Sequence, residues 1–289
     1  MARVVPAAAR CRKAIHVNAG KNGNICPGSH WNNQPRPPAP LPPISDARTA
    51  TVRGGGYRGG MNTSTTITLG ICADTHGEAL PTWPDQRLDA VLHAGDVYDA
   101  PRLAQGYDYV SPRSWAQTLG APVLAVRGNH DFRDPDGFFM VAEDVSGRVV
   151  RLSQGLWVAG VGFAPSWYCD TPGDSDLESQ CRDLTRMVNR LVMPGERIIL
   201  LTHYPPRVME LVGRGTPATW SYQRVGELAE ILRPVAIIFG HQHDWFGRHW
   251  RRADGTLLVS PGPRGGVLTI AAHGEATFMR NDASSIDPQ

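Results

Sequence analysis

Several features of membrane and secreted proteins are missing from this sequence. No apolar run approaches the ~20 residues that a membrane-spanning helix requires, and the N-terminus lacks the apolar segment of a signal peptide. The five cysteines are odd in number and irregularly spaced, which does not fit a disulfide framework. We therefore expect a cytoplasmic protein with reduced cysteines and no membrane partner.

Lysine is absent after residue 60, and the charge of the chain is unevenly distributed. Residues 1–60 contain nine Lys or Arg and one acidic residue, Asp46, whereas the remainder contains 20 arginines and 26 acidic residues. No basic patch marks this acidic remainder. Electrostatics therefore do not favour a nucleic-acid partner.

Residues 1–62 also lack the apolar periodicity of packed elements. Gln34–Pro43 is rich in proline and Arg53–Gly60 is rich in glycine, and neither composition supports a hydrophobic core. We expect this extension to be disordered and residues 282–289 to form a flexible tail. Met61 directly follows a Gly/Arg run of the kind that a purine-rich ribosome-binding sequence would encode. We therefore hypothesise that translation starts at Met61, and an intact mass that includes the extension would contradict this.

Five apolar runs between residues 63 and 281 each end in polar side chains. The runs are short and rich in β-branched residues, which is typical of buried strands; they are Thr66–Ala73, Leu88–Ala94, Pro122–Val126, Arg197–Thr202 and Pro234–Phe239. The segments that follow them are Asp74-Thr-His76, Gly95-Asp96, Gly128-Asn-His-Asp131, His203 and Gly240-His-Gln-His243. In open α/β sheets, ligands bind beyond the carboxyl ends of the strands. We therefore expect these polar groups to meet at one rim.

Further elements are expected between and after these strands. An apolar face with helical spacing predicts a helix over Asp176–Val192, and Ser175 with Glu178 forms a capping box before it. Shorter helices are expected over Ser111–Leu119 and Tyr222–Arg233, a hairpin over Arg148–Gly162, and a strand meander over Thr256–Met279.

The polar residues at the strand ends are the donor types that divalent metals of intermediate hardness bind. The candidate ligands are Asp74, His76, Asp96, Asn129, His203, His241 and His243. Seven ligands are too many for one catalytic ion with an open position, and they suit two ions that share a carboxylate, as in sites that act on phosphorus. Spacing alone does not assign the ligands to ions. His130 is placed to act on the leaving group, and we expect Asp131 to hold its ring.

Three neighbouring residues have open interpretations. Arg127 is placed either to bind phosphate or to pair with an acid. His93 is expected to be a buried residue behind the ligands and not a ligand itself. Trp245 is a candidate wall of a substrate cleft, because it follows His243 closely.

Taken in order, the five motifs resemble those of the calcineurin-like metallophosphoesterases. All five are present without substitution between residues 67 and 243. The resemblance implies an α/β fold, a two-sheet β-sandwich flanked by helices in a four-layer αββα arrangement, over residues 63–281. It implies that Asp74, His76, Asp96 and His243 hold one metal ion, and that Asp96 bridges to a second ion held also by Asn129, His203 and His241. A metal-bridging hydroxide would attack phosphorus, and His130 would protonate the departing alkoxide.

We expect two manganese ions, with iron or zinc as alternatives, and a small phosphorylated substrate. The predicted function is metal-dependent hydrolysis of a phosphomonoester or phosphodiester. A nuclease or a protein phosphatase with the same dinuclear site is the alternative, but the acidic body disfavours the first and the short spacing between motifs disfavours the second. A non-enzymatic scaffold is disfavoured because its ligand set would be free to lose residues.

Overall fold

The structure of the chain is a computed structural model that describes residues 66–78, 80–99, 105–106, 108–131, 134–162, 174–211 and 220–281. The expected disordered extension, residues 1–62, and the expected tail, residues 282–289, lie outside the described residues. None of the helices in the described part is long and apolar enough to cross a membrane.

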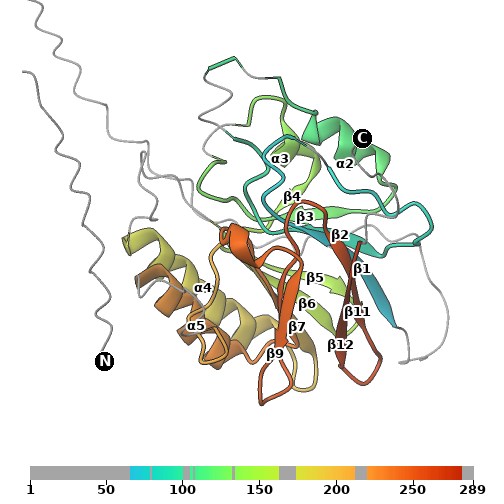
Figure 1. The fold of residues 1–289 in the computed structure, drawn as a ribbon. Helices are drawn as coiled ribbons and strands as arrows, with labels where there is room; N and C mark the ends of the chain where they lie inside the picture. Colours follow the sequence, from blue (N-terminus) through green and yellow to red (C-terminus); the bar gives the residue numbers. More distant parts are fainter. Residues whose placement is uncertain are drawn as a thin grey trace, which may run out of the picture. The chain divides into compact units, whose positions relative to one another are not determined.

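Within the described residues, the strands form two six-stranded sheets (Figure 1). The first sheet has the order β12 (Ala276–Arg280), β11 (Gly266–Ile270), β1 (Ile67–Cys72), β2 (Ala90–His93), β3 (Val123–Ala125) and β4 (Glu143–Asp144). The second has the order β5 (Val149–Ser153), β6 (Leu156–Val161), β7 (Arg197–Thr202), β8 (Ala236–Ile238), β10 (Leu257–Ser260) and β9 (Arg248–Arg251).

Each sheet combines four parallel strands with two strands in antiparallel pairing. Strands β1 to β4 run parallel, and β11 and β12 complete the first sheet in antiparallel pairing. In the second sheet β6, β7, β8 and β10 run parallel, between antiparallel β5 and β9. The carboxyl ends of the parallel strands in a sheet lie at the same edge. The predicted ligands come directly after these strands in the sequence, so they lie at this edge.

The alternation of side chains along the strands divides the core into layers. In β7, Ile199 and Leu201 face the first sheet and pack in a cluster with Leu69 and Leu92. Their neighbours face the other way, and Leu200 packs in a cluster with residues of the two long helices. A strand buried on both faces needs apolar residues at every position, which explains the continuous apolar runs of the sequence.

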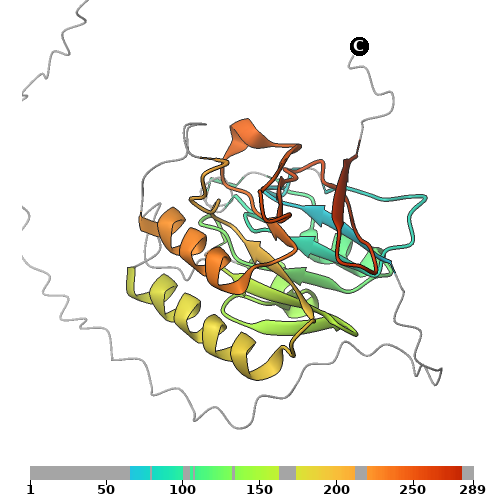
Figure 2. The same cartoon turned by 90° about the horizontal axis from the view of Figure 1, so that it is seen from below.

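Helices cover the outer face of each sheet. The long helices α4 (Asp174–Leu191) and α5 (Trp220–Leu232) lie side by side and pack on the second sheet (Figures 1 and 2). The short helices α2 (Pro112–Thr118) and α3 (Phe138–Val141) bring Trp115 and Phe138 onto the outer face of the first sheet. The described residues thus confirm the predicted α/β sandwich of two sheets flanked by helices.

The predicted helices and the hairpin are confirmed, with bounds that differ by up to two residues. Helix α4 begins at Asp174, so Ser175 lies inside the first turn and not before the helix, where a capping residue stands. Ser111 does cap α2, because its side chain accepts a hydrogen bond from the Ser114 backbone N–H.

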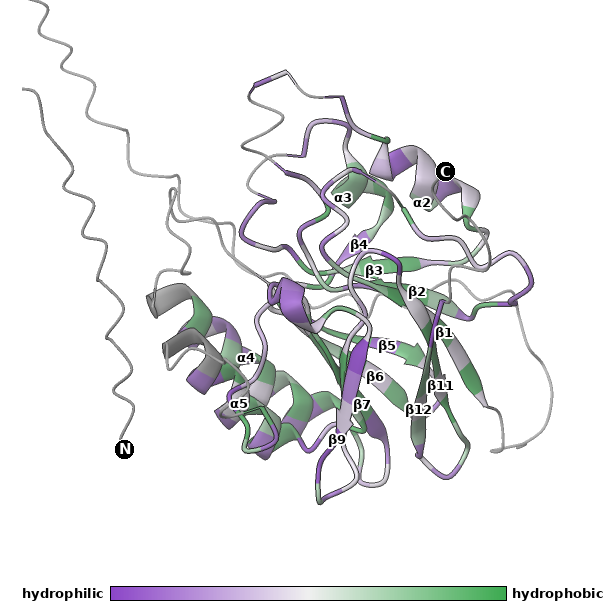
Figure 3. Ribbon diagram, in the orientation of Figure 1, coloured by the Kyte–Doolittle hydropathy of each residue, from purple (hydrophilic) through white to green (hydrophobic). Residues whose placement is uncertain are grey.

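The predicted meander over residues 256–279 is confirmed for the antiparallel pair β11 and β12 and is wrong for β10. Strand β10 belongs to the second sheet, where it pairs with β8 and β9, whereas β11 and β12 belong to the first. Strand β9, which the sequence analysis missed, consists of hydrophilic residues around Trp250 and lies at a sheet edge (Figure 3). Its formation depends on pairing with β10 and not on an apolar pattern of its own.

Candidate metal centre

The seven predicted ligands follow strands of both sheets. Asp74 and His76 follow β1, Asp96 follows β2, and Asn129 follows β3, while His203 follows β7 and His241 and His243 follow β8. Asn129 Oδ1 lies 2.9 Å from His203 Nε2 and 2.8 Å from His241 Nδ1. The amide oxygen of the first sheet therefore contacts two imidazoles of the second, so the polar groups meet at one rim that joins the two sheets.

Six of the seven predicted ligands gather in two groups, and a third group of possible ligands joins His76 to Asp99 and His130. One contains Asp74, His76 and His243, and the other contains Asp96, His203 and His241; within each group the ligand atoms lie within 4.8 Å of one another. Asp96 Oδ2 is 3.4 Å from His203 Nε2 and 4.0 Å from His76 Nε2, so its carboxylate lies between the groups. This placement suits a shared carboxylate, and the assignment of each ligand to an ion stays a prediction.

Backbone strain concentrates at this rim. Among the described residues, five that are not glycine have a left-handed backbone, and four of them are predicted ligands: Asp74 (φ 54°), His76 (φ 49°), Asp96 (φ 53°) and His241 (φ 67°). Such conformations cost on the order of 1 kcal/mol or more each and are typical of functional sites. Backbone hydrogen bonds hold them, including Asp74 N–H to Gly95 O at 2.9 Å and His76 N–H to Asp96 O at 3.0 Å.

At two positions of the motifs the backbone approaches a carboxylate so closely that only glycine fits. A Cβ on Gly128 would lie 2.1 Å from Asp96 Oδ1, and a Cβ on Gly240 would lie 2.2 Å from Asp74 Oδ2. No side chain fits at these distances. The glycine before Asn129 and the glycine before His241 therefore let neighbouring segments approach the two carboxylates.

Backbone carbonyls orient two of the imidazoles. Nδ1 of His76 donates to the carbonyl of Tyr98 at 3.3 Å, and Nδ1 of His203 donates to the carbonyl of Ala94 at 2.9 Å. A carbonyl only accepts, so Nδ1 carries the proton and Nε2 faces the carboxylates. This is the arrangement by which proteins present histidine to a metal.

Burial and neighbouring charges shift the pKa values of the acidic and imidazole groups at the rim. Burial raises the pKa of Asp74 to about 8, against the effect of His203, and the nearby Asp96 adds to the rise. Burial alone lowers the pKa of His203, but the carboxylate of Asp96 raises it to about 9. His203 thus serves as the counter-cation of Asp96 in the metal-free protein.

The donor set fits divalent ions. Nε2 of His76 is buried and has no hydrogen-bond partner among the described residues, although burial of a polar atom without a partner is costly. Burial also lowers the pKa of His76, which keeps the imidazole neutral and able to bind a metal. A cation between His76 and the two carboxylates would satisfy this nitrogen and offset the buried negative charge.

His130 lies at the edge of the same rim. Its ring packs at right angles against His76, with 5.1 Å between ring centroids, and its side chain is 31 % exposed. Nδ1 of His130 is 3.6 Å from Oδ1 of Asp99. Asp99 is the residue that the sequence analysis missed, and the signal that would have found it is a second aspartate in the loop Gly95-Asp-Val-Tyr-Asp99.

The prediction that Asp131 holds the ring of His130 is wrong. Asp131 is buried, and its carboxylate accepts from the backbone N–H of Tyr98 at 3.0 Å and of Gly128 at 2.8 Å. Both oxygens point into the loop because two backbone donors would otherwise be unpaired. Asp131 therefore braces the loops that carry Asp96 and Asn129.

His93 forms hydrogen bonds to the two loops that follow β1 and β2 and carry metal ligands. It is fully buried, its Nδ1 accepts from Gly95 N–H at 3.2 Å, and its Nε2 donates to Thr75 Oγ1 at 3.0 Å. The hydroxyl of Thr75 in turn donates to Val97 O at 3.3 Å. Burial lowers the pKa of His93 to about 3, so the ring is neutral, as one donor and one acceptor contact require.

The side chains of Arg127 and Trp245 contact other protein side chains and do not line the metal centre. Arg127 Nε lies 2.8 Å from Asp144 Oδ2, and the guanidinium stacks on Phe139; of its two interpretations, pairing with an acid is the one observed. Trp245 belongs to the short 3₁₀ helix η1 (His243–Trp245) and is buried against Phe239 and Trp250. Its prediction as a cleft wall is wrong.

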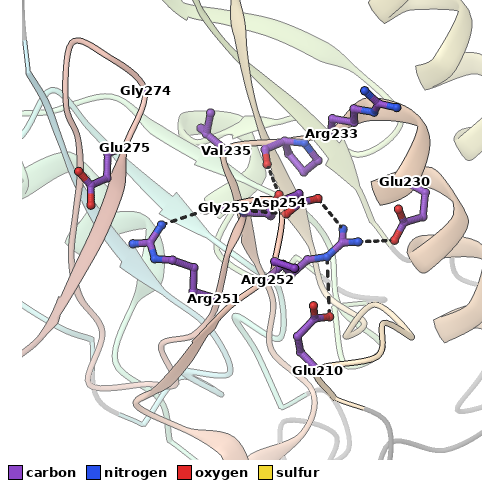
Figure 4. Close-up of a pocket in the computed structure, with 13 residues that line it drawn as sticks. Glu210, Glu230, Arg233, Val235, Arg251, Arg252, Asp254, Gly255, Gly274 and Glu275 are labelled. Atoms are coloured by element: carbon purple, nitrogen blue, oxygen red, sulfur yellow. Dashed lines mark hydrogen bonds and ion pairs between the residues drawn. The ribbon is translucent and has the colours of Figure 1, made fainter.

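A cavity of about 840 Å³ lies away from the rim, where β8 and β10 begin (Figure 4). Arg252 crosses it, is 11 % exposed and faces the carboxylates of Glu210, Glu230 and Asp254. No histidine is among the described residues that line it, and the three carboxylates there face the guanidinium of Arg252. This cavity therefore does not extend the metal centre.

The fold and the rim together define a class: a two-sheet α/β sandwich with carboxylate, amide and imidazole donors at the strand ends. The sequence model of the family described as calcineurin-like phosphoesterase matches residues 67–245. The chain belongs to this family, as its motifs implied, and membership indicates metal-dependent phosphoester hydrolysis. No curated protein matches the chain.

Solved structures share the fold at low sequence identity. The crystal structure of TT1561 of Thermus thermophilus is 15 % identical, with a TM-score of 0.50, and the match covers 75 % of this chain and 99 % of that chain. A structure named "Putative 5'-Nucleotidase from Staphylococcus aureus in complex with alpha-ketoglutarate" is also 15 % identical, with a TM-score of 0.51, over 78 % of this chain and 56 % of that chain. At this identity the likeness concerns the fold alone.

Proposed function

We propose that this protein hydrolyses a small phosphomonoester or phosphodiester with two bound divalent metal ions, manganese being the expected metal. The observation that supports this is the convergence of seven donors from both sheets, with Asp96 between two ligand groups. Neither a nuclease nor a protein phosphatase gains a specific supporting observation from the described residues.

Asp74, His76 and His243 would hold one ion, and Asn129, His203 and His241 the other, with Asp96 serving both. When bound, such ions polarise phosphoryl oxygens and lower the pKa of a water molecule. The protein supplies the geometry, because the left-handed loop residues and the carbonyl-oriented imidazoles position the donors.

His130 would protonate the leaving oxygen. Asp99 stands beside Nδ1, so a proton on that nitrogen faces a carboxylate, and the ring is exposed enough to meet a substrate. With Nδ1 oriented toward Asp99, Nε2 is the nitrogen left to donate. General-acid catalysis of this kind contributes about 10²–10⁴-fold in rate.

The test is turnover of p-nitrophenyl phosphate and bis-p-nitrophenyl phosphate by the full chain with added Mn²⁺. Hydrolysis of either substrate supports the proposal, and the ratio of the rates separates a monoesterase from a diesterase. We expect Asp96→Asn to lose activity by about 10²-fold or more, because one carboxylate serves both ions. Exposed Asp108→Asn is the matched control; equal rates in the two variants would refute the assignment.

A further inference from the structure

A second cavity of about 840 Å³ adjoins the candidate metal centre. It lies between the segment that follows β1 and the loop that joins β10 to β11, and Asp74 and Thr75 are among the residues that line it. The loop from β10 is fixed against the ligand segment, because Ala73 N–H donates to Gly262 O at 3.1 Å. One predicted metal ligand, Asp74, therefore belongs to the lining of this cavity.

One wall of this cavity is apolar and rigid. Trp83 is buried, and its indole Nε1 donates to Gly266 O at 3.0 Å, which fixes the ring between the segment after β1 and the first sheet. Leu80, Val267 and Met279 continue the wall. Met279 is 62 % exposed, so part of this wall is open to solvent.

The rim of the cavity carries a cation. Arg264 is exposed on the loop between β10 and β11, and among the described residues no carboxylate lies within ion-pair distance of its guanidinium. Its backbone carbonyl accepts from Asn281 Nδ2 at 3.2 Å, which fixes the loop. Arg280, Glu78 and Asp85 also line the cavity. The guanidinium of Arg280 lies against Gly247, so Arg264 is the cation left to meet an anion.

We infer that this cavity holds the organic part of the phosphoester substrate, an apolar, ring-sized group with an anionic substituent that reaches Arg264. The inference rests on the proposed phosphoesterase function, since it needs a scissile phosphate at the rim beside Asp74. A ring on the Trp83 and Met279 wall would be removed from water, and the substituent would form a charge-assisted contact with the guanidinium.

The experiment compares phenyl phosphate with 4-carboxyphenyl phosphate as substrates of the manganese-loaded full chain. The corresponding phosphonates, which are not hydrolysed, report binding separately by calorimetry. We expect a lower KM and tighter phosphonate binding for the carboxylated compounds. Arg264→Gln should raise KM for 4-carboxyphenyl phosphate about tenfold, the value of one charge-assisted contact, and leave phenyl phosphate within about twofold.

Two control variants match the test variants. Arg87→Gln removes an exposed arginine that does not line the cavity, and Met193→Ser removes a methionine that is 64 % exposed elsewhere. Met279→Ser should raise KM about threefold for both aryl phosphates, because it removes apolar wall, whereas Met193→Ser should not.

Two outcomes separate the inference from the proposed function. The cavity assignment is overturned if the wild type is active but Arg264→Gln has the same KM as Arg87→Gln, and Met279→Ser the same KM as Met193→Ser. The phosphoesterase activity would then still stand. Absence of turnover of the aryl phosphates and of bis-p-nitrophenyl phosphate overturns the activity itself. Selective loss of binding of the carboxylated phosphonate in Arg264→Gln supports the cavity assignment without depending on turnover.

Discussion

Oδ1 of Asp99 lies 3.6 Å from Nδ1 of His130, so the loop after β2 supplies the acid that faces the imidazole of the loop after β3. At this distance the carboxylate attracts a proton on Nδ1 electrostatically, without forming a hydrogen bond to it. We expect Asp99→Asn to lower kcat about 10–100-fold with little change in KM or bound manganese, because the change affects proton transfer and not metal binding.

The double variant distinguishes cooperation from independent roles. If Asp99 acts through His130, adding Asp99→Asn to His130→Asn has no further effect on kcat. Multiplicative losses would show that the two residues act separately. Exposed Asp108→Asn serves as the control and keeps the wild-type rate.

The hydroxyl of Thr75 joins the two loops that carry Asp74 and Asp96, through His93 Nε2 and Val97 O. Thr75→Val keeps the shape and leaves a buried N–H and a buried carbonyl unpaired, so we expect a loss of about 1–3 kcal/mol in the free energy of unfolding. Manganese affinity should fall about tenfold, as is typical when a group behind the ligands is removed. Thr75→Ser retains the hydroxyl and should stay near the wild type in both measurements; equal values for the two variants would contradict this role.

The neutral His93 makes a pH-dependent contribution to stability. Burial lowers its pKa from the ordinary 6.5 to about 3 in the folded protein, so the unfolded chain binds the proton first as the pH falls. Its contribution is therefore complete above about pH 6.5 and is lost as the pH falls toward 3. In urea unfolding of the metal-free protein, His93→Gln should lose less stability than the wild type between pH 7 and pH 5. An identical loss in both proteins would show that His93 is not buried as described.

Gly128 has no room for a side chain, because a Cβ would meet Asp96 Oδ1 at 2.1 Å and the Asp96 backbone nitrogen at 2.4 Å. We expect Gly128→Ala to displace the shared carboxylate and lower bound manganese, measured by elemental analysis, at least about tenfold. Gly155→Ala is the control, since Gly155 has a positive φ but no atom within 4 Å of a Cβ. That change should cost about 1 kcal/mol in stability and leave metal content unchanged. Full metal content in Gly128→Ala would contradict the close approach.

Arg252 binds Glu210, Glu230 and Asp254 together at the far cavity (Figure 4). Arg252→Met removes the cation that these carboxylates face, so we expect the free energy of unfolding in urea to fall by about 2 kcal/mol, less than for a fully buried pair because two of the acids are exposed. Arg248→Met, at an exposed position of β9, should stay within about 0.5 kcal/mol of the wild type. An equal effect of the two changes would show that the cluster adds no stability.

Local pattern was sufficient for most elements and for the ligand candidates. The apolar runs predict strands because a strand buried on both faces needs an apolar residue at nearly every position, and the polar residues after them stand out for the same reason. The apolar face of α4 was equally visible, since Leu177, Leu184 and Val188 recur with the period of a helix and are buried.

What the sequence by itself determined is which residues end the strands and what chemistry they offer. Only the tertiary structure decided which strands share a sheet, that Asp99 and not Asp131 faces His130, and that Trp245 is buried in the core. The physical reason is that partners such as these are distant in sequence and meet only when the two sheets pack. A local pattern shows that a carboxylate or an indole needs a partner, but the packed chain determines which partner it finds.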